Sequence, residues 1–394
     1  MERTAGGVWR MNRVPVYLVR LVHSNPHSHS HSNLDSDSHT HSHSHAPRIP
    51  DPPPVDTHRH SKATLDFAQS SKQAVSKPAA RLTIGRARDY SSSLLASSLT
   101  AANLISPFVP LTARDAQIAL NAFAVTLQRA AHPPHTSSSN ISVASGASSA
   151  TARLRLQFWK QTLQDIFAGK VPPSEPVAVL LAEVIKQRAY TRSFFTRMVD
   201  ARMARVGDPP FASISSLADY GEAAYSSMLY LLGESMPSAH STEAEHVCSH
   251  IGRAIGVVDI LTDFPAAVER RRRVLLPLDI MIKYDLREED LLRRLDRQDA
   301  ELNKRLQDAI FEVATHANDQ LITARSMFEE TVTKIGGRKS IDDAMFAPML
   351  SAVATKTWLE QLEKVDFNLY SPKLKLKKWS LPWKMYLAYK SRRI

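Results

Sequence analysis

Two aspartates stand four residues apart in the segment GVVDILTDFPAAVERRRRVLLP, which covers residues 256–277. They are Asp259 and Asp263, and this spacing places two side chains on the same face of an α-helix. A pair of carboxylates on one face can bind Mg²⁺, and bound Mg²⁺ can hold a diphosphate group. The pair is therefore a candidate for half of a metal–diphosphate site.

The alternative is that this face of the helix is solvated or paired with arginine. Arg253 precedes the aspartates, and Arg270–Arg273 follow them closely enough in sequence to reach them. Pro265 lacks a backbone N–H, so it cannot continue the hydrogen-bond ladder of a helix. We favour the solvated or arginine-paired face over Mg²⁺ binding and expect no metal ion at this place.

Other side chains with reactive or ligating groups give weaker indications. Cys248 is the only cysteine, which excludes a disulfide within the chain, and we expect a small buried side chain rather than a nucleophile. His246 and His250 have the spacing of a metal-binding pair but lack a third ligand. Three tyrosines are expected to pack in the core: Tyr220, Tyr225 and Tyr230. The sequence therefore predicts no metal and no other cofactor.

The elements that carry these residues are predicted to be helices. Of the 394 residues, 43% are hydrophobic and only 12 are glycine, and no sustained alternating strand pattern occurs. We expect an all-α protein with one large helical domain over residues 84–365. Within it, the polar, serine-rich stretch 131–151 is expected to be a flexible insertion.

The N-terminal region is predicted to be a targeting signal rather than part of the fold. Four arginines against one acid, interspersed with apolar residues, are typical of a mitochondrial transit peptide, which we place at residues 1–25. Residues 26–83 are rich in His, Ser and Pro and too poor in apolar residues to fold, so we expect a disordered linker. Its histidines can bind metal ions adventitiously, but we favour the linker interpretation.

The positive charge of the chain restricts its partners. The net charge of +11 suits nucleic acid, an anionic membrane or an acidic partner. No nucleic-acid-binding motif is present, so we expect no nucleic acid, and no apolar run approaches the roughly 18 residues of a transmembrane helix. Residues 366–394 form a basic, aromatic tail with eight Lys or Arg and one acid. Its candidates for contact with an anionic membrane are Lys377, Lys378, Trp379, Trp383, Lys384 and Tyr386.

Three segments together resemble the squalene/phytoene synthase family of head-to-head prenyl synthases. PFVPLTARDAQIALNAFAV looks like the segment that leads into the first acidic motif, with Arg114 at the position of a family arginine. LADYGEAAYSSMLYLLG, with Tyr220 and Tyr225, resembles the tyrosine-rich helix that lines the substrate cavity. HIGRAIGVVDILTDFPAAVERRRRVLLP looks like the second acidic motif and the basic loop after it. The resemblance implies an isoprenoid-synthase fold in which two aspartate-rich walls bind Mg²⁺.

The chain departs from that family at the first acidic motif. Gln128 and Arg129 stand where the family has its acidic pair, and no carboxylate occurs anywhere in residues 116–152. Arg129 would also repel a metal ion, because both carry positive charge. The resemblance therefore implies that one of the two metal-binding walls is missing.

The second motif is only partly retained. Asp263 matches its first aspartate, whereas Ala266 and Ala267 replace a later Glu-Asp pair. Asp259 stands at an asparagine position, and Thr262 replaces the arginine before the first aspartate. We therefore interpret the matched positions as a vestigial active site and expect no catalytic residue.

Four segments resemble a non-catalytic mitochondrial branch of the family, the complex I assembly factor 6 group. They are LRLQFWKQTLQDIF followed by PPSEPVAVLL, HIGRAIGVVDIL, RRRRVLLPLDIMIKYDLREEDLLRR, and the C-terminal LPWKMYLAYK. This resemblance implies a catalytically silent protein that helps to assemble respiratory complex I at the matrix face of the inner membrane, with complex I subunits or other assembly factors as partners. Two other functions stay open: an active transferase that uses prenyl diphosphates, and a protein that binds a prenyl lipid without turnover.

Overall fold

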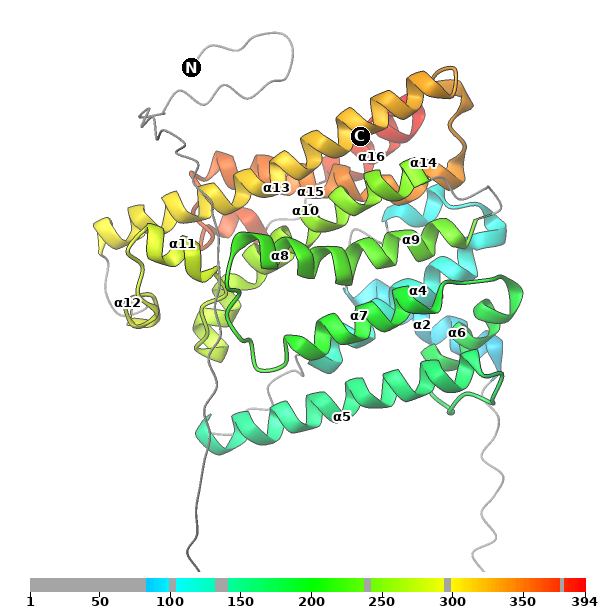
Figure 1. Cartoon of the computed structure of the whole chain (residues 1–394), viewed down its shortest axis with the longest axis horizontal. Helices are drawn as coiled ribbons and strands as arrows, with labels where there is room; N and C mark the ends of the chain where they lie inside the picture. Colours follow the sequence, from blue (N-terminus) through cyan, green and yellow to red (C-terminus); the bar gives the residue numbers. More distant parts are fainter. Residues whose placement is uncertain (1–82, 99–103, 132–140, 237–241, 294–298, 376–378) are drawn as a thin grey trace, which may run out of the picture. The chain divides into compact units, whose positions relative to one another are not determined.

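The computed structural model describes residues 83–98, 104–131, 141–236, 242–293, 299–375 and 379–394. The chain divides into two units, residues 1–75 and 76–394, and all described residues belong to the second. Every regular element in these ranges is a helix, which confirms the predicted all-α class (Figure 1). None of these helices is both long and apolar enough to span a bilayer. The predicted transit peptide, and the predicted linker except for its last residue, lie outside the described residues.

The first group of helices packs around one aliphatic and aromatic core. Its members are α2 (Ile84–Ser98), α4 (Arg114–Ala131), α5 (Ile141–Phe167), α6 (Pro176–Gln187) and α7 (Arg192–Ala204). Phe123 of α4 is fully buried, and its ring centroid lies 5.4 Å from that of Trp159 on α5 and 5.9 Å from that of Phe195 on α7. Large buried rings contribute strongly to core stability, so these three residues hold α4, α5 and α7 together.

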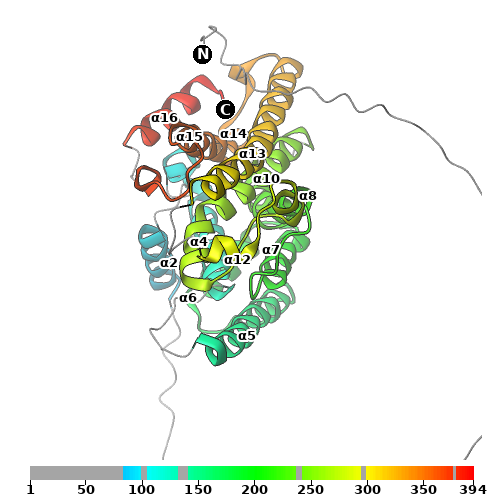
Figure 2. The ribbon, with the colours of Figure 1, turned by 90° about the vertical axis from the view of Figure 1, so that its left-hand side faces the viewer.

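The second group of helices packs around α10. Its members are α8 (Ile214–Gly221), α9 (Ser227–Glu234), α10 (Thr242–Ala266), α11 (Leu278–Lys283), α12 (Glu288–Arg293), α13 (Ala300–Lys334), α14 (Asp343–Met349), α15 (Ser351–Lys364) and α16 (Ser380–Ser391). α10 lies beside the long helix α13 in both Figure 1 and Figure 2, and it also contacts α8 and α15. The helix that carries the aspartate pair is therefore enclosed by other helices on several sides.

Glycines allow α10 to approach the α8–α9 segment at backbone contact. Between α8 and α9 the chain forms a π-helical turn, Glu222–Ser226. A Cβ atom at Gly252 would collide with the backbone of Ser226, and one at Gly256 would collide with the Cα atom of Gly221. Only glycine permits such a close backbone approach. These glycines therefore set the position of α8 and the π-turn, which carry two of the three tyrosines, against the aspartate helix.

Residues 141–151 are helical, so the predicted flexible insertion is wrong for this part. They form the beginning of α5, while residues 132–140 of the predicted insertion lie outside the described residues. The stretch 141–151 contains no proline, and its alanines favour helix. A polar, serine-rich composition was therefore insufficient evidence for a loop.

The aspartate helix also runs further than predicted. α10 passes through Pro265 and ends at Ala266, and a π-helical turn, Ala267–Arg271, follows directly. A π-turn is wider than an α-turn and changes the hydrogen-bond register next to the residue that lacks a donor. This turn folds the arginine run back toward the end of α10, where Asp263 lies.

Candidate functional site

Arg271 binds the second aspartate of the candidate pair. Its Nη2 lies 2.5 Å from Oδ2 of Asp263, and its Nε lies 2.7 Å from Oδ2 of Asp208, in the loop after α7. The side chains of Arg271 and Asp208 are 17% and 7% exposed, so this bridge is largely shielded from water. Burial acts to lower the pKa of Arg271, but the two carboxylates outweigh it and raise the pKa. The arginine pairing expected from the sequence is thus present at Asp263.

Arg202 of α7 occupies the space beside the first aspartate. Its side chain is buried, and its Nη1 donates a hydrogen bond to the hydroxyl of Tyr220. The guanidinium carbon lies 5.5 Å from the ring centroid of Tyr220 and 5.0 Å from that of Tyr225. Burial acts to lower the pKa of Arg202, but the electrostatic effects of the two tyrosines and Asp259 outweigh burial, and the pKa is raised. Arg202 is therefore a permanent internal cation beside Asp259.

The same cluster contains one further arginine. Arg205 lies with its guanidinium carbon 3.9 Å from the ring centroid of Phe211, and it donates a hydrogen bond to a backbone carbonyl, that of Pro209. Burial lowers the pKa of Arg205, and Asp208 opposes this effect. Three arginines thus stand among three carboxylates, those of residues 208, 259 and 263. The formal charges of this cluster balance without any added ion.

The residues of this cluster do not fit the Mg²⁺ that the family resemblance implies. Mg²⁺ needs a near-octahedral shell of oxygen ligands, and it usually takes one or two of them from carboxylates. Here Asp263 is occupied by Arg271, and Arg202 places a positive charge beside Asp259. Among the described residues, no group of three or more His, Cys, Asp or Glu is arranged to hold a metal ion. The arginines supply the counter-charge that a metal would otherwise supply.

The vestigial positions are divided between this cluster and the surface. Tyr220 and Tyr225 belong to the cluster with the two aspartates, and Ala267 is buried at the start of the π-turn that supplies Arg271, next to Ala266. In contrast, three positions from the first motif segment are exposed on α4: Arg114, Gln128 and Arg129. The structure therefore places an arginine cluster at the second motif and a solvent-facing helix end at the first.

Arg253 pairs with a different carboxylate from the one considered in the sequence. Its Nε lies 3.4 Å from Oε2 of Glu222 in the π-turn. Glu222 also accepts hydrogen bonds from the hydroxyls of Tyr230, at 2.7 Å, and Ser249, at 2.5 Å. Burial acts to raise the pKa of Glu222, but these hydrogen bonds and Arg253 outweigh it, and the pKa is lowered. This polar network ties the π-turn to α10 a short distance along the helix from the aspartates.

The remaining candidate ligands on α10 are Cys248, His246 and His250, and none of them lies in a metal-binding arrangement among the described residues. Cys248 is buried, and burial raises the pKa of its thiol to about 12, so the reactive thiolate is strongly disfavoured. His250 has its Nδ1 2.7 Å from Oε1 of Gln320 on α13, whereas His246 is exposed. The burial of Cys248 agrees with the expectation of a small buried side chain.

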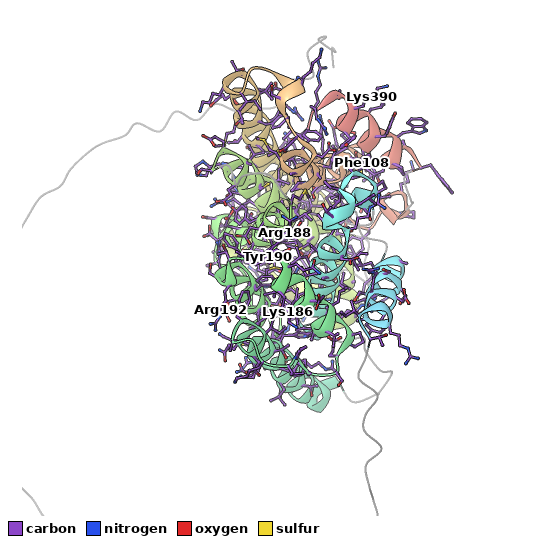
Figure 3. All side chains as sticks on the ribbon, turned by 90° about the vertical axis from the view of Figure 1, so that its right-hand side faces the viewer. Phe108, Lys186, Arg188, Tyr190, Arg192 and Lys390 are labelled. Carbon is purple, nitrogen blue, oxygen red and sulfur yellow. The ribbon has the colours of Figure 1, made fainter. Side chains whose placement is uncertain are left out.

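The C-terminal helix α16 packs on the second helix group through one face. Met385 is fully buried, and the ring of Tyr389 lies 4.7 Å from that of Phe108, centroid to centroid. Figure 3 labels Phe108 and, on α16, Lys390. The Tyr389 hydroxyl donates a 2.7 Å hydrogen bond to Asp343, which also forms an ion pair with Arg392. The segment that the sequence predicted to be a tail is therefore partly built into the fold.

The opposite face of α16 is exposed and aromatic. Trp379 is 91% exposed, and Trp383, Tyr386 and Leu387 follow at helical spacing, all exposed. Of the predicted membrane-contact lysines, Lys384 forms an ion pair with Glu360 at 2.8 Å. Lys377 and Lys378 lie outside the described residues. The structure thus separates the candidates into an outward aromatic stripe and a lysine that holds α16 to α15.

Three members of the cluster were not predicted from the sequence: Arg202, Arg205 and Asp208. The sequence does indicate that Arg202 is buried. It follows Met198 by four residues and Val199 by three, which places it on the apolar face of α7. A charged residue at a core position of an amphipathic helix needs a buried partner. That partner could not be named, because it comes from another helix.

Comparisons with known proteins show which proteins this chain resembles. The model of the family described as squalene/phytoene synthase matches residues 96–382. A relative from Homo sapiens, NADH dehydrogenase (ubiquinone) complex I, assembly factor 6, is 32% identical over 285 residues, which cover 72% of this chain and 76% of the relative. The protein of the same name from Bos taurus is 31% identical with the same coverage. A homolog from Drosophila melanogaster is 31% identical over 222 residues, 55% of this chain and 61% of the relative.

Solved structures show the same fold. A dehydrosqualene synthase in complex with ligand superposes with a TM-score of 0.60 at 17% identity, covering 78% of this chain and 97% of that chain. A squalene synthase from Alicyclobacillus acidocaldarius superposes with a TM-score of 0.55 at 14% identity, covering 72% and 96%. The predicted isoprenoid-synthase-like architecture is therefore confirmed, and the chain belongs to the squalene/phytoene synthase family.

Proposed function

We propose that this protein is a catalytically silent member of its family that acts in the assembly of mitochondrial respiratory complex I. The observation that carries the silence is the arginine cluster, in which Arg271 and Arg202 take the places beside the two aspartates. The assembly role rests on the relatives, which are named as complex I assembly factors. Complex I subunits or other assembly factors are the partners that this role requires.

The charge arrangement argues against the family reaction. Departure of a diphosphate requires positive charge that is free to bind it, which metal ions supply in such enzymes. The guanidinium of Arg271 is already bound by two carboxylates, Arg202 is buried between tyrosines, and the first motif has no carboxylate. Neither wall can therefore assemble a metal–diphosphate complex.

The silence is tested by turnover and by metal binding. The purified protein, incubated with farnesyl or geranylgeranyl diphosphate and Mg²⁺, is expected to give no squalene or phytoene above a heat-killed control. Isothermal titration calorimetry is expected to show no stoichiometric binding of Mg²⁺. Product above the control, or Mg²⁺ binding that Asp259→Ala and Asp263→Ala both abolish, would contradict the proposal.

The assembly role is tested separately by complementation of a deletion strain. Asp263→Asn removes a charge that family chemistry needs but leaves Arg271 paired with Asp208. We expect this variant to restore complex I activity as well as the unchanged protein, because no reaction depends on the carboxylate. Loss of complementation by a variant that melts at the wild-type temperature would point to a catalytic role.

We place the protein at the matrix face of the inner membrane, attached peripherally through α16. The support is the exposed stripe of Trp379, Trp383, Tyr386 and Leu387 on a basic segment. Aromatic side chains suit the headgroup layer, and each basic residue near an anionic surface contributes about 1 kcal/mol. The proposed transit peptide at residues 1–25 would deliver the chain to the matrix.

Point variants test the membrane contact better than removal of the whole segment. Deleting residues 366–394 would also remove the buried Met385 and the ion pair of Arg392 with Asp343. Trp379→Ser combined with Trp383→Ser removes two exposed side chains and is expected to reduce salt-sensitive sedimentation with cardiolipin-containing liposomes. Ile282→Ser on α11, which changes a side chain that is 81% exposed, is the control. Equal sedimentation of all three proteins would exclude attachment through this stripe.

A further inference from the structure

Lys356 on α15 is a half-buried cation that forms neither a hydrogen bond nor an ion pair with another described residue. Burial lowers the pKa of its ammonium group, and the positive charges of Arg325 and Lys384 lower it further. Glu360 acts in the opposite direction, but the net shift is downward. A cation that has lost water without gaining a close partner is unfavourable in free energy. An additional anion at this place would therefore be stabilised.

The neighbouring cations come from the two helices that α15 contacts, α13 and α16 (Figure 2). From α13, Nε of Arg325 donates a 2.8 Å hydrogen bond to the main-chain carbonyl of Ile394. From α16, Nζ of Lys384 lies 2.8 Å from Oε2 of Glu360, which follows Lys356 by four residues and so lies on the same face of α15. Arg325 and Lys384 therefore already have partners, and Lys356 is the cation of this cluster that lacks one among the described residues.

The cluster borders the exposed aromatic stripe of α16. Lys384 follows Trp383 directly and precedes Leu387 by three residues, so it lies at the edge between the packed face of α16 and the stripe. Its side chain stays 41% exposed despite the ion pair with Glu360. Trp383 and Leu387 are 66% and 59% exposed. Positive charge and exposed apolar side chains therefore meet along one edge of α16.

We propose that Lys356 binds the phosphate group of an anionic lipid headgroup, with Lys384 and Arg325 beside the same group. The inference rests on the proposed membrane attachment through α16 and names the lipid chemistry that this attachment recognises. A phosphodiester carries a negative charge and accepts charge-assisted hydrogen bonds from an ammonium group. The tryptophans of the stripe suit the headgroup layer, where such phosphates lie, and this position favours a lipid over a soluble acidic segment.

A short-chain lipid in monomeric form tests the site without a membrane surface. Dihexanoyl phosphatidylglycerol, kept below its critical micelle concentration, is expected to raise the melting temperature of the full-length protein, because a ligand of the folded state stabilises it. Lys356→Gln should abolish this rise, whereas Lys390→Gln, which removes an exposed lysine of α16 outside the cluster, should retain it. Inorganic phosphate at the same ionic strength should have no effect. An equal rise with inorganic phosphate would identify a site for free anions, and a rise retained in Lys356→Gln, or none in the unchanged protein, would equally overturn the proposal.

Sedimentation with vesicles separates this inference from the attachment itself. Lys356→Gln should lower binding to cardiolipin-containing vesicles about tenfold and leave binding to phosphatidylcholine vesicles unchanged, whereas Trp379→Ser combined with Trp383→Ser should weaken both. Lys304→Gln, which removes one exposed charge from α13, is the control for net charge and should bind as the unchanged protein does. If the unchanged protein binds no vesicles, the attachment fails and the inference fails with it. If it binds and Lys356→Gln binds equally well, the inference alone fails.

The stability of Lys356→Gln without lipid excludes a merely structural role. The change removes a half-buried cation from the neighbourhood of two others, so the variant should melt no lower than the unchanged protein. A lower melting temperature would show that Lys356 stabilises the fold itself and would overturn the assignment of its charge to a lipid.

Discussion

Replacing Arg202 by methionine removes the guanidinium from the second-motif cluster while it keeps a flexible side chain of comparable length. In the structure this guanidinium donates a hydrogen bond to the hydroxyl of Tyr220, lies over two tyrosine rings and is attracted electrostatically by Asp259. The single change leaves a carboxylate without its internal cation. The double change Arg202→Met and Asp259→Asn removes the charge from both partners. The two variants therefore separate the contribution of the arginine to stability from the effect that its loss has on Asp259.

The expected magnitude follows from the burial of the two partners. Removing one member of a buried ion pair costs about 3–5 kcal/mol, because the other charge remains poorly solvated. Arg202 is 6% exposed, but Asp259 is only partly buried, so water offsets some of the loss. We expect Arg202→Met to reduce the free energy of unfolding by about 3 kcal/mol, the lower end of that range. The coupling energy between the two positions should be about 1–2 kcal/mol.

Urea denaturation followed by circular dichroism measures these quantities for the wild type, the single variants Arg202→Met and Asp259→Asn, and the double variant. Urea is preferred to guanidinium chloride, because guanidinium ion is the chemical group that the variant lacks. The slope of the unfolding free energy against urea should stay constant, which shows that only stability has changed. Additive effects within about 0.5 kcal/mol would refute the reasoning, since Arg202 would then not act on Asp259. A higher wild-type midpoint in Mg²⁺ would refute it as well.

Three further outcomes are expected from other parts of the fold. Gly256→Ala should destabilise the protein by more than about 3 kcal/mol in thermal or urea unfolding, because the new Cβ atom would collide with the backbone of α8. Gly233→Ala in α9, which has open space around it, is the control and should change stability by less than about 1 kcal/mol. Similar effects of the two substitutions would contradict the close contact between α10 and α8. Because the pKa of Glu222 is lowered, its carboxylate stabilises the fold above the ordinary pKa of 4.5, and this stabilisation is lost as the pH falls through the lowered pKa. Glu222→Gln should therefore reduce the loss of unfolding free energy at acid pH. An unchanged dependence of the unfolding free energy on pH would contradict this role of Glu222. Cys248, with its thiol pKa raised to about 12, should resist iodoacetamide at pH 8 until urea unfolds the protein, and rapid labelling of the native state would contradict its burial.

Much of the helical architecture could be predicted from periodicity. Apolar residues recur at helical spacing in α4, α6 and α13, so their helical structure follows from the sequence pattern. Errors occurred where composition replaced periodicity, as at residues 141–151, which are polar and yet helical. A further error concerned Pro265, because the π-turn that accommodates it is not encoded in a simple residue rule.

In the C-terminal segment, too, composition predicted part of the structure and packing decided the rest. Its lysines and aromatic residues made it a candidate for membrane contact, but composition did not indicate which face would be free. Packing of Met385 and the ion pair between Lys384 and Glu360 decide that Trp379 and Trp383 point outward. The side chains were predictable as a set, whereas their individual roles depended on the docking of α16.

At the aspartate motifs, the sequence by itself determined what is missing. Residues 116–152 contain no carboxylate, and no folding can supply a chemical group that the chain lacks at that place. Only the tertiary structure decided what accompanies the aspartates that remain: Arg202 arrives from α7, and Arg271 is returned to Asp263 by a π-turn. The physical reason is that ion pairing falls off with distance through space, and distances between helices are set by side-chain packing and by the glycine contacts of α10, not by separation along the chain.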